Sequence, residues 1–255
     1  MAWQNPKTDW GAADGVRDTD FNRIEGNLLE LYTTDAARAD VTIYVSTSGS
    51  DSGEGSSGSP YATISKALSV LPKNLNGKNI IVNIAAGTYA DDILVDGFNN
   101  GVLILKASGS VSVRSLLVRN ATLRVEINSF TVTTGVAGAG IIAYDNGCII
   151  FTGDVVTQSS TQGIVANSGS IQVSGTARIS NVNTGISATN NGNVFAFAVT
   201  GSGIGTGMIA SNGGVIAYGT FSATISTAIS ATTTGGRINT GSQSAGGIGG
   251  GGGVL

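Results

Sequence analysis

The chain repeats one four-residue motif at intervals of about 22 residues: Gly140-Ile141-Ile142-Ala143, Gly163-Ile164-Val165-Ala166, Gly185-Ile186-Ser187-Ala188 and Gly207-Met208-Ile209-Ala210. A decayed copy follows at Ala228-Ile229-Ser230-Ala231, so that the successive steps are 23, 22, 22 and 21 residues long. A short, nearly constant period of this kind is typical of a solenoid, in which each repeat forms one turn of the structure.

An Asn-rich turn that ends on glycine follows each copy of the motif. The four turns are Asp145-Asn146-Gly147, Asn167-Ser168-Gly169, Asn190-Asn191-Gly192 and Asn212-Gly213-Gly214. Asn and Gly are the residues that best accept a positive φ. We therefore expect these turns to adopt backbone conformations with positive φ and to stack along one edge of the solenoid.

The repeats are predicted to be strands rather than helices. They consist mainly of Ile, Val, Thr, Ser, Asn and Gly, a composition that favours strands. Runs such as 170–174 and 176–180 alternate apolar and polar residues, and this places the apolar side chains on one face. About three strands fit each repeat, and rungs stacked about 4.8 Å apart would bury their apolar faces together. The predicted fold is an all-β parallel β-helix.

Large side chains near the middle of each repeat are predicted to form one interior column. They lie 10 to 12 positions after the starting glycines, at Phe151, Val173, Phe195 or Phe197, and Tyr218. An exposed row of aromatic residues would provide a platform for sugars, but an interior column is the simpler interpretation.

The sequence divides into three parts. Residues 1–40 form an arm with a predicted helix, residues 41–240 form the β-helix, and residues 241–255 form a Gly-rich tail. Within the second part, residues 60–71 have helical spacing behind Pro60, which suits a helix start. A solenoid needs its open end covered, and we expect this helix to act as the cap.

Apolar residues of the arm have the spacing of about two heptads: Phe21, Ile24, Leu28 and Leu31. This pattern is compatible with a short coiled coil that joins three chains, although a convincing coiled coil needs three or four heptads. The alternative is a single helix that packs on its own solenoid or on a larger particle.

Composition excludes several classes of site and partner. A net charge of −3 and the absence of a basic cluster argue against nucleic-acid binding. With no histidine and a single cysteine, the chain cannot form the usual zinc or haem ligand sets or an intramolecular disulfide. We therefore expect no cofactor or metal, and interpret Cys148 as a small buried apolar residue. No signal peptide or membrane span is recognisable, which predicts synthesis in the cytoplasm without membrane insertion.

Four segments resemble the first part of pectin-lyase-like β-helices: Tyr44-Val45-Ser46, Gly49-Ser50-Asp51, Pro60-Tyr61-Ala62-Thr63-Ile64 and Ile84-Ala85-Ala86-Gly87-Thr88-Tyr89. The resemblance covers residues 42–96 and implies a right-handed parallel β-helix. That superfamily includes lyases, hydrolases, esterases, viral tailspikes and inactive adhesins, so that the fold by itself does not select a function.

The arm resembles the N-terminal segment of bacteriophage and prophage tail or baseplate proteins, through Pro6-Lys7-Thr8-Asp9-Trp10, Asp14-Gly15 and Asn22-Arg23-Ile24-Glu25-Gly26-Asn27. In that family the segment attaches a variable distal module to the particle. The resemblance implies a location in the virion, contact with other tail or baseplate proteins, and a set of attachment residues: Trp3, Pro6, Lys7, Trp10, Asn22, Arg23 and Glu25.

Carboxylates are sparse in the solenoid, where Glu126, Asp145 and Asp154 are the only acids after residue 100. Hydrolysis of a glycosidic bond uses two carboxyl groups about 5 to 10 Å apart, and no two of these acids are related by the repeat. Arg124 and Glu126, two positions apart, are predicted to form an ion pair on the outside of a rung. The remaining catalytic candidates gather near the capped end: Asp91, Asp92 and Asp96.

These observations predict a non-enzymatic tail fibre or receptor-binding subunit, forming a homotrimer, that displays a β-helical shaft to host-surface glycans. One alternative is a tail-associated polysaccharide depolymerase, a lyase or hydrolase, whose carboxylates come from Asp91, Asp92, Asp96 or Glu126. Another is a purely structural collar or baseplate protein that contacts no host molecule.

Overall fold

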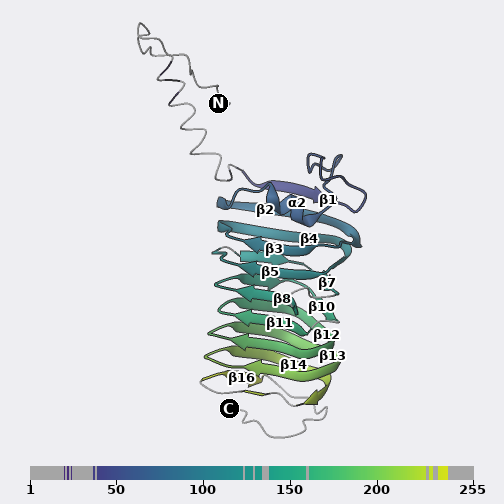
Figure 1. Cartoon of the computed structure of the whole chain (residues 1–255), viewed down its shortest axis with the longest axis vertical. Helices are drawn as coiled ribbons and strands as arrows, with labels where there is room; N and C mark the ends of the chain where they lie inside the picture. Colours follow the sequence, from purple (N-terminus) through teal and green to yellow (C-terminus); the bar gives the residue numbers. More distant parts are fainter. Residues whose placement is uncertain are drawn as a thin grey trace.

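The structure, a computed structural model, describes residues 20, 22, 24, 37, 39–122, 124–128, 130–133, 138–158, 161–227, 230–231 and 235–240. Residues 39–240 of this set form a parallel β-solenoid of about seven turns (Figure 1). Its strands are β1 (Val41–Val45), β2 (Asn74–Thr88), β3 (Asp92–Asp96), β4 (Asn99–Val113), β5 (Ser115–Arg119), β6 (Arg124–Ile127), β7 (Phe130–Val132), β8 (Ala139–Tyr144), β9 (Cys148–Phe151), β10 (Val155–Gln158), β11 (Gln162–Asn167), β12 (Ser170–Thr189), β13 (Asn193–Ala210), β14 (Val215–Thr227), β15 (Ser230–Ala231) and β16 (Arg237–Thr240). The all-β parallel solenoid predicted from the repeats is confirmed.

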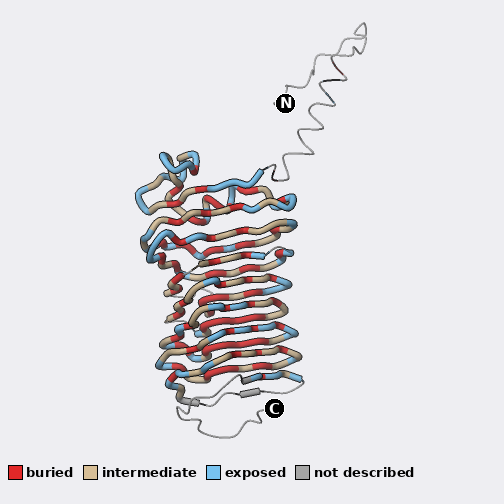
Figure 2. The backbone as a smooth tube through the Cα atoms, turned by 180° about the vertical axis from the view of Figure 1, so that it is seen from behind, coloured by how far each residue is buried: buried red, intermediate tan, exposed pale blue. Residues whose placement is uncertain are grey.

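The strands stack into three faces, and the long strands bend from one face to the next. Face A contains β1, β6, β9, β16 and the first parts of β2, β4, β12, β13 and β14. Face B contains β7, β10 and later parts of the long strands. Face C contains β3, β5, β8, β11, β15 and the ends of β12 and β13. In Figure 2, buried residues alternate with less buried ones along the rungs.

The four-residue motif forms the interior of face C. Ile141 pairs with Ile164, Ile164 with Ile186, and Ile186 with Met208. The alanines of the motif pair in the same way, and both columns are completely buried. The repeat period therefore equals one turn of the solenoid, and the apolar positions of successive turns bury one another.

The interior column of face A differs from the sequence prediction at one rung. Phe151 pairs with Val173, Val173 with Ala196, and Ala196 with Tyr218, all of them buried. Phe195 and Phe197 lie outside, with 49% and 64% of their surface exposed, so their predicted interior position is wrong. Successive side chains of a strand point to opposite faces, and a shift of one residue exchanges inside for outside.

The closing glycines of the turns are required by packing rather than by a positive φ. A Cβ atom on Gly192 would lie 2.1 Å from the carbonyl oxygen of Ala166 on the preceding rung, and one on Gly214 would lie 2.1 Å from that of Ala188. Positive φ occurs instead at residues before the closing glycine, such as Asn191 at 62°. The positive φ predicted for the Asn-rich turns is confirmed, while the closing glycines allow neighbouring rungs to approach each other closely.

Helix α2 (Ile64–Ser69) covers the N-terminal end of the interior beside β1 (Figure 1). It buries Ile64, Ala67 and Leu68. Thr63 is its N-cap and accepts a hydrogen bond from the Lys66 amide. The helix is shorter than the helical spacing of residues 60–71 suggested, because residues 60–63 are used for the loop and the cap.

Asp91 completes the start of α2. Its buried carboxylate accepts hydrogen bonds from the backbone amides of Ile64 and Ser65, at 3.1 and 3.4 Å, and from the Ser65 hydroxyl at 2.6 Å. We expect Asp91→Ala to lower the free energy of unfolding by about 1–3 kcal/mol, because it leaves these donors without an acceptor. Urea denaturation followed by circular dichroism would measure this loss.

The matched control is Asp92→Ala, on the neighbouring residue. Asp92 points outward, where it accepts from the Ser115 hydroxyl and pairs with Arg114 at 3.5 Å. Since exposed ion pairs contribute little, its removal should cost no more than about 1 kcal/mol. Equal losses for the two variants would contradict the assigned role of Asp91.

Parts of the arm also belong to the described residues. Asp20, Asn22 and Ile24 have helical backbone conformation, as predicted for this segment, and Ile24 is 54% exposed. Nearer the solenoid, the Ala37 amide donates to the Asn74 carbonyl on β2. The other attachment and oligomerisation residues and the Gly-rich tail lie outside the described residues: Trp3, Pro6, Lys7, Trp10, Phe21, Arg23, Glu25, Leu28, Leu31 and residues 241–255.

Candidate functional site

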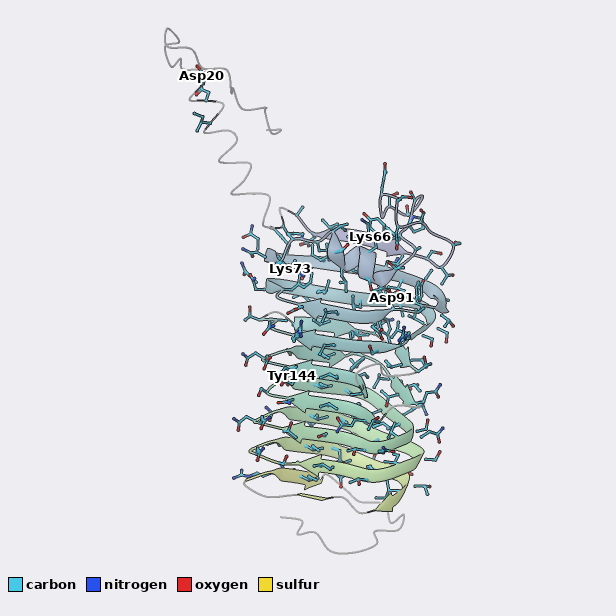
Figure 3. All side chains as sticks on the ribbon, in the orientation of Figure 1. Asp20, Lys66, Lys73, Asp91 and Tyr144 are labelled. Carbon is cyan, nitrogen blue, oxygen red and sulfur yellow. The ribbon has the colours of Figure 1, made fainter. Side chains whose placement is uncertain are left out.

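The three acids near the capped end do not converge on one point. Asp91 is buried against the start of α2, and Figure 3 shows its place near this helix. Asp92 and Asp96 lie on the outer side of face C. Asp96 accepts from the Arg119 guanidinium at 2.9 Å and from the Asn120 amide at 3.1 Å. Each carboxylate therefore has its own set of hydrogen-bond donors, and no two of them form a shared acid and base.

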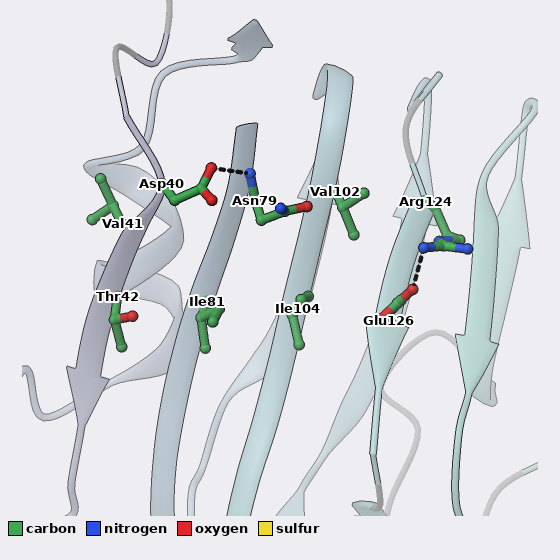
Figure 4. Close-up of a pocket in the computed structure, with 9 residues that line it drawn as sticks. All are labelled: Asp40, Val41, Thr42, Asn79, Ile81, Val102, Ile104, Arg124 and Glu126. Atoms are coloured by element: carbon green, nitrogen blue, oxygen red, sulfur yellow. Dashed lines mark hydrogen bonds and ion pairs between the residues drawn. The ribbon is translucent and has the colours of Figure 1, made fainter. Parts of the chain in front are cut away.

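Glu126 lies in a groove on the outer side of face A (Figure 4). The groove has a volume of about 350 Å³ and crosses β1, β2, β4 and β6. Its middle is apolar, with Ile81 and Ile104 on neighbouring strands. At one end Glu126 pairs with Arg124, which confirms the ion pair predicted from their spacing.

The second carboxylate of this groove belongs to Asp40, at the opposite end. It accepts a hydrogen bond from the Asn79 amide at 2.9 Å. Asp40 and Glu126 are three strands apart in the register, which corresponds to about 14 Å at the usual inter-strand spacing. This is longer than the carboxyl separation of about 5 to 10 Å used by retaining and inverting glycosidases.

Asp154 and Asp51 also stabilise local structure. Asp154 accepts from the Thr176 amide at 2.8 Å and pairs with Arg178 at 2.9 Å. Asp51 accepts from the amides of Ala62 and Thr63 and so holds the loop before α2. Among the described residues, no group of three or more acidic or cysteine side chains has the arrangement needed for a metal ion.

The carboxylates of Asp96 and Asp154 make the stability of the fold depend on pH. The Arg119 hydrogen bond lowers the pKa of Asp96, and the Thr176 amide followed by Arg178 lowers the pKa of Asp154. A lowered folded-state pKa adds stability above the unfolded-state pKa of about 3.9, and this stability is lost as the pH falls through the folded-state value. We expect the melting temperature of the double variant Asp96→Asn with Asp154→Asn to fall less than that of the wild type as the pH is lowered from 5 through the folded-state pKa values of the two carboxylates. Parallel melting-temperature profiles for the two proteins would contradict this expectation.

Cys148 lies on the outer side of face A, half-buried, between Arg124 and Ser170 of the adjacent rungs. The predicted interior position is therefore wrong. Partial burial raises the pKa of its thiol, against the smaller opposing effect of Arg124. The thiol is thus less ionised at neutral pH than that of a free cysteine.

The stacked turns between faces C and A form a regular polar surface of the solenoid. Asn190 donates its side-chain amide to the Asn167 side-chain oxygen at 3.0 Å, and Asn212 donates to Asn190 at 3.2 Å. The Ser168 hydroxyl donates to the Asn190 carbonyl at 2.9 Å. These hydrogen bonds join successive rungs and confirm that the turns stack on one edge.

An open depression of about 400 Å³ lies in this edge. Every residue that lines it is an asparagine, a serine or a glycine: Asn146, Gly147, Ser168, Gly169, Ser170, Asn190, Asn191 and Asn193. We call this set the asparagine edge. It presents amide and hydroxyl groups, which both donate and accept hydrogen bonds. Its lining residues carry no formal charge, and the exposed carboxylate of Asp145 adjoins it next to Asn146.

Comparison with protein families, with curated proteins and with solved structures found no match. Among the described residues, no helix has the length and apolar character needed to cross a membrane.

A second polar depression, of about 540 Å³, lies beside the loop that follows β1. It is lined by Tyr44 and by several hydroxyl and amide groups, of which the Ser108 hydroxyl donates to the Asn83 side-chain oxygen at 2.5 Å. Because part of its lining comes from the irregular loop after β1, the repeat pattern contained no signal for it. The asparagine edge, in contrast, was visible in the sequence as a repeated turn.

Proposed function

We propose that this chain is a fibre or receptor-binding subunit of a phage tail or of a phage-derived particle. Its arm would attach to other particle proteins, and its solenoid would project as a shaft that contacts host-surface glycans. The proposal rests mainly on the asparagine edge, an uncharged row of amide and hydroxyl groups on a rigid scaffold.

Neutral hydrogen-bonding groups suit carbohydrate contact. Sugar hydroxyls donate and accept hydrogen bonds, as do the side chains of Asn and Ser. A charged surface would instead attract any oppositely charged envelope component and would discriminate poorly among hosts. The rung-to-rung hydrogen bonds of Asn167, Asn190 and Asn212 hold the edge in place before a ligand arrives, which reduces the entropic cost of binding.

Attachment through the arm is proposed from its resemblance to phage tail proteins. We expect the full-length variant Trp10→Ala with Arg23→Ala to fold normally but to be missing from purified particles. Immunogold electron microscopy with an antibody against the solenoid would show this. Particles that carry the variant at the wild-type level would contradict the proposed attachment residues.

Binding of the purified full chain to a panel of bacterial strains and their wall polysaccharides tests the glycan contact. We expect sedimentation with some strains and competition by the corresponding polysaccharide. Binding to none would contradict a receptor-binding role and favour a purely structural one. Release of reducing sugar from a bound polysaccharide would replace this proposal with a depolymerase.

We extend the proposal to a homotrimer that is joined by the heptad residues of the arm. The exposed side chain of Ile24 is compatible with such a contact. Light scattering on the purified chain should give three times the mass of one chain, and a monomeric mass would contradict it.

A further inference from the structure

Two exposed phenylalanines adjoin the asparagine edge on the outer side of face A. Phe195 and Phe197 lie on β13, and their exposed fractions are 49% and 64%. Together the two rings form one apolar patch beside polar residues, and an apolar patch rimmed by polar residues is the kind of surface at which ligands bind.

The neighbouring rungs leave the rings accessible. Phe195 is paired with Ala217 on the following rung and with Gln172 on the preceding one. Gly219 lies beside Phe197, and a Cβ atom on this glycine would come within 2.4 Å of the Phe197 carbonyl oxygen. Alanine and glycine are too small to cover an aromatic ring, so both rings remain accessible to solvent on the side of the following rung.

The platform formed by Phe195 and Phe197 shares one strand with the asparagine edge. Asn193 lines the depression and is the first residue of β13, and residues 193, 195 and 197 are all exposed while residues 194 and 196 are buried. Phe195 is thus about 7 Å along the strand from Asn193, on the same side. The three face A rungs at 170–174, 193–197 and 215–219 contain no charged residue.

A sugar ring matches this arrangement. It has an apolar C–H face that packs on an aromatic ring and a rim of hydroxyls that bond to amides. We propose that Phe195, Phe197 and the asparagine edge together bind a neutral oligosaccharide lying along β13. This inference rests on the proposed glycan contact and specifies its site and its ligand class.

The two rings by themselves offer too little apolar surface for a stable interface with a second copy of the chain. Their exposed parts amount to about 200 Å², since a whole aromatic side chain buries about 150–250 Å². A stable interface buries about 800 Å² per partner. The patch is of the size needed for one or two sugar rings.

The test uses the full-length chain and its double variant Phe195→Ala with Phe197→Ala. Both proteins would be applied to an array of neutral and acidic bacterial surface polysaccharides, and a bound neutral oligosaccharide would then be titrated by calorimetry. We expect the wild type to bind neutral glycans and the double variant to bind them at least about tenfold more weakly. Asn193→Ala should weaken binding of the same glycans.

Leu94→Ala is the matched control, because Leu94 is 44% exposed but lies on face C. It should bind like the wild type, and circular dichroism should show that all variants are folded. If the wild type binds neutral glycans and the double variant binds them equally well, the site is wrong while the proposed function stands.

Three other results would also overturn the inference. Binding of acidic glycans alone would exclude the neutral ligand class. Absence of any glycan binding by the wild type would remove the proposed glycan contact as well. Self-association of the wild type in light scattering that is lost in the double variant, with glycan binding unchanged, would assign the platform to a second copy.

Discussion

Phe151→Ala is expected to lower the free energy of unfolding by about 3–5 kcal/mol, the usual cost of removing a fully buried phenylalanine ring. Phe151 is completely buried in the interior column of face A, between Ile127 and Val173 on the adjacent rungs. The alanine would leave a cavity, because the rungs on both sides are fixed by backbone hydrogen bonds and cannot close the space. Urea denaturation monitored by circular dichroism would measure the change.

Phe195→Ala is the control for this experiment. It removes the same ring from the same face, but from the outside of a rung. Its free energy of unfolding should change by less than about 0.5 kcal/mol. A large loss for Phe195→Ala, together with a small one for Phe151→Ala, would mean that the register of face A is shifted by one residue.

Gly192→Ala is expected to cost about 3 kcal/mol, the upper end of the range for overpacking. The added Cβ would lie 2.1 Å from the Ala166 carbonyl oxygen, a backbone atom that cannot rotate away. Relief of this contact requires the turn to move away from the preceding rung, which weakens the hydrogen bonds between the two turns. The variant should melt at a distinctly lower temperature.

Gly58→Ala is the matched control, since a Cβ on Gly58 would meet no atom within 4 Å. Its melting temperature should stay close to that of the wild type or rise slightly, because alanine restricts the unfolded chain. If both variants behave alike, the close approach of rungs at the turn is not a determinant of stability.

The repeat explains why the fold is predictable from the sequence. A motif that returns at nearly constant spacing places like residues above one another, and the spacing alone therefore predicts the pairs Ile164 with Ile186 and Ala166 with Ala188, which are confirmed. The Arg124 and Glu126 pair follows from a similar argument, because a separation of two residues puts both side chains on one side of a strand.

The prediction failed where both alternating positions of a strand are apolar. Every residue from Val194 to Ala198 is apolar, so the composition does not indicate which alternate residues face the interior. The prediction therefore placed the larger rings inside, which is wrong. In the structure the interior position belongs to Ala196, because the hydrogen-bond register pairs it with the buried Val173 on the preceding rung. Contacts across long intervals, such as Asp91 with the start of α2, have no counterpart in the repeat and were not visible in the sequence.

The parallel register of the rungs also has an evolutionary consequence. Duplication or loss of one repeat, for example residues 163–184, would add or remove one complete rung. All later strands would shift by about 4.8 Å and still meet partners with the same pattern of apolar residues. Unequal recombination between neighbouring repeats can thus alter the length of the shaft in whole steps, so homologues from different genomes should differ in length by multiples of about 22 residues.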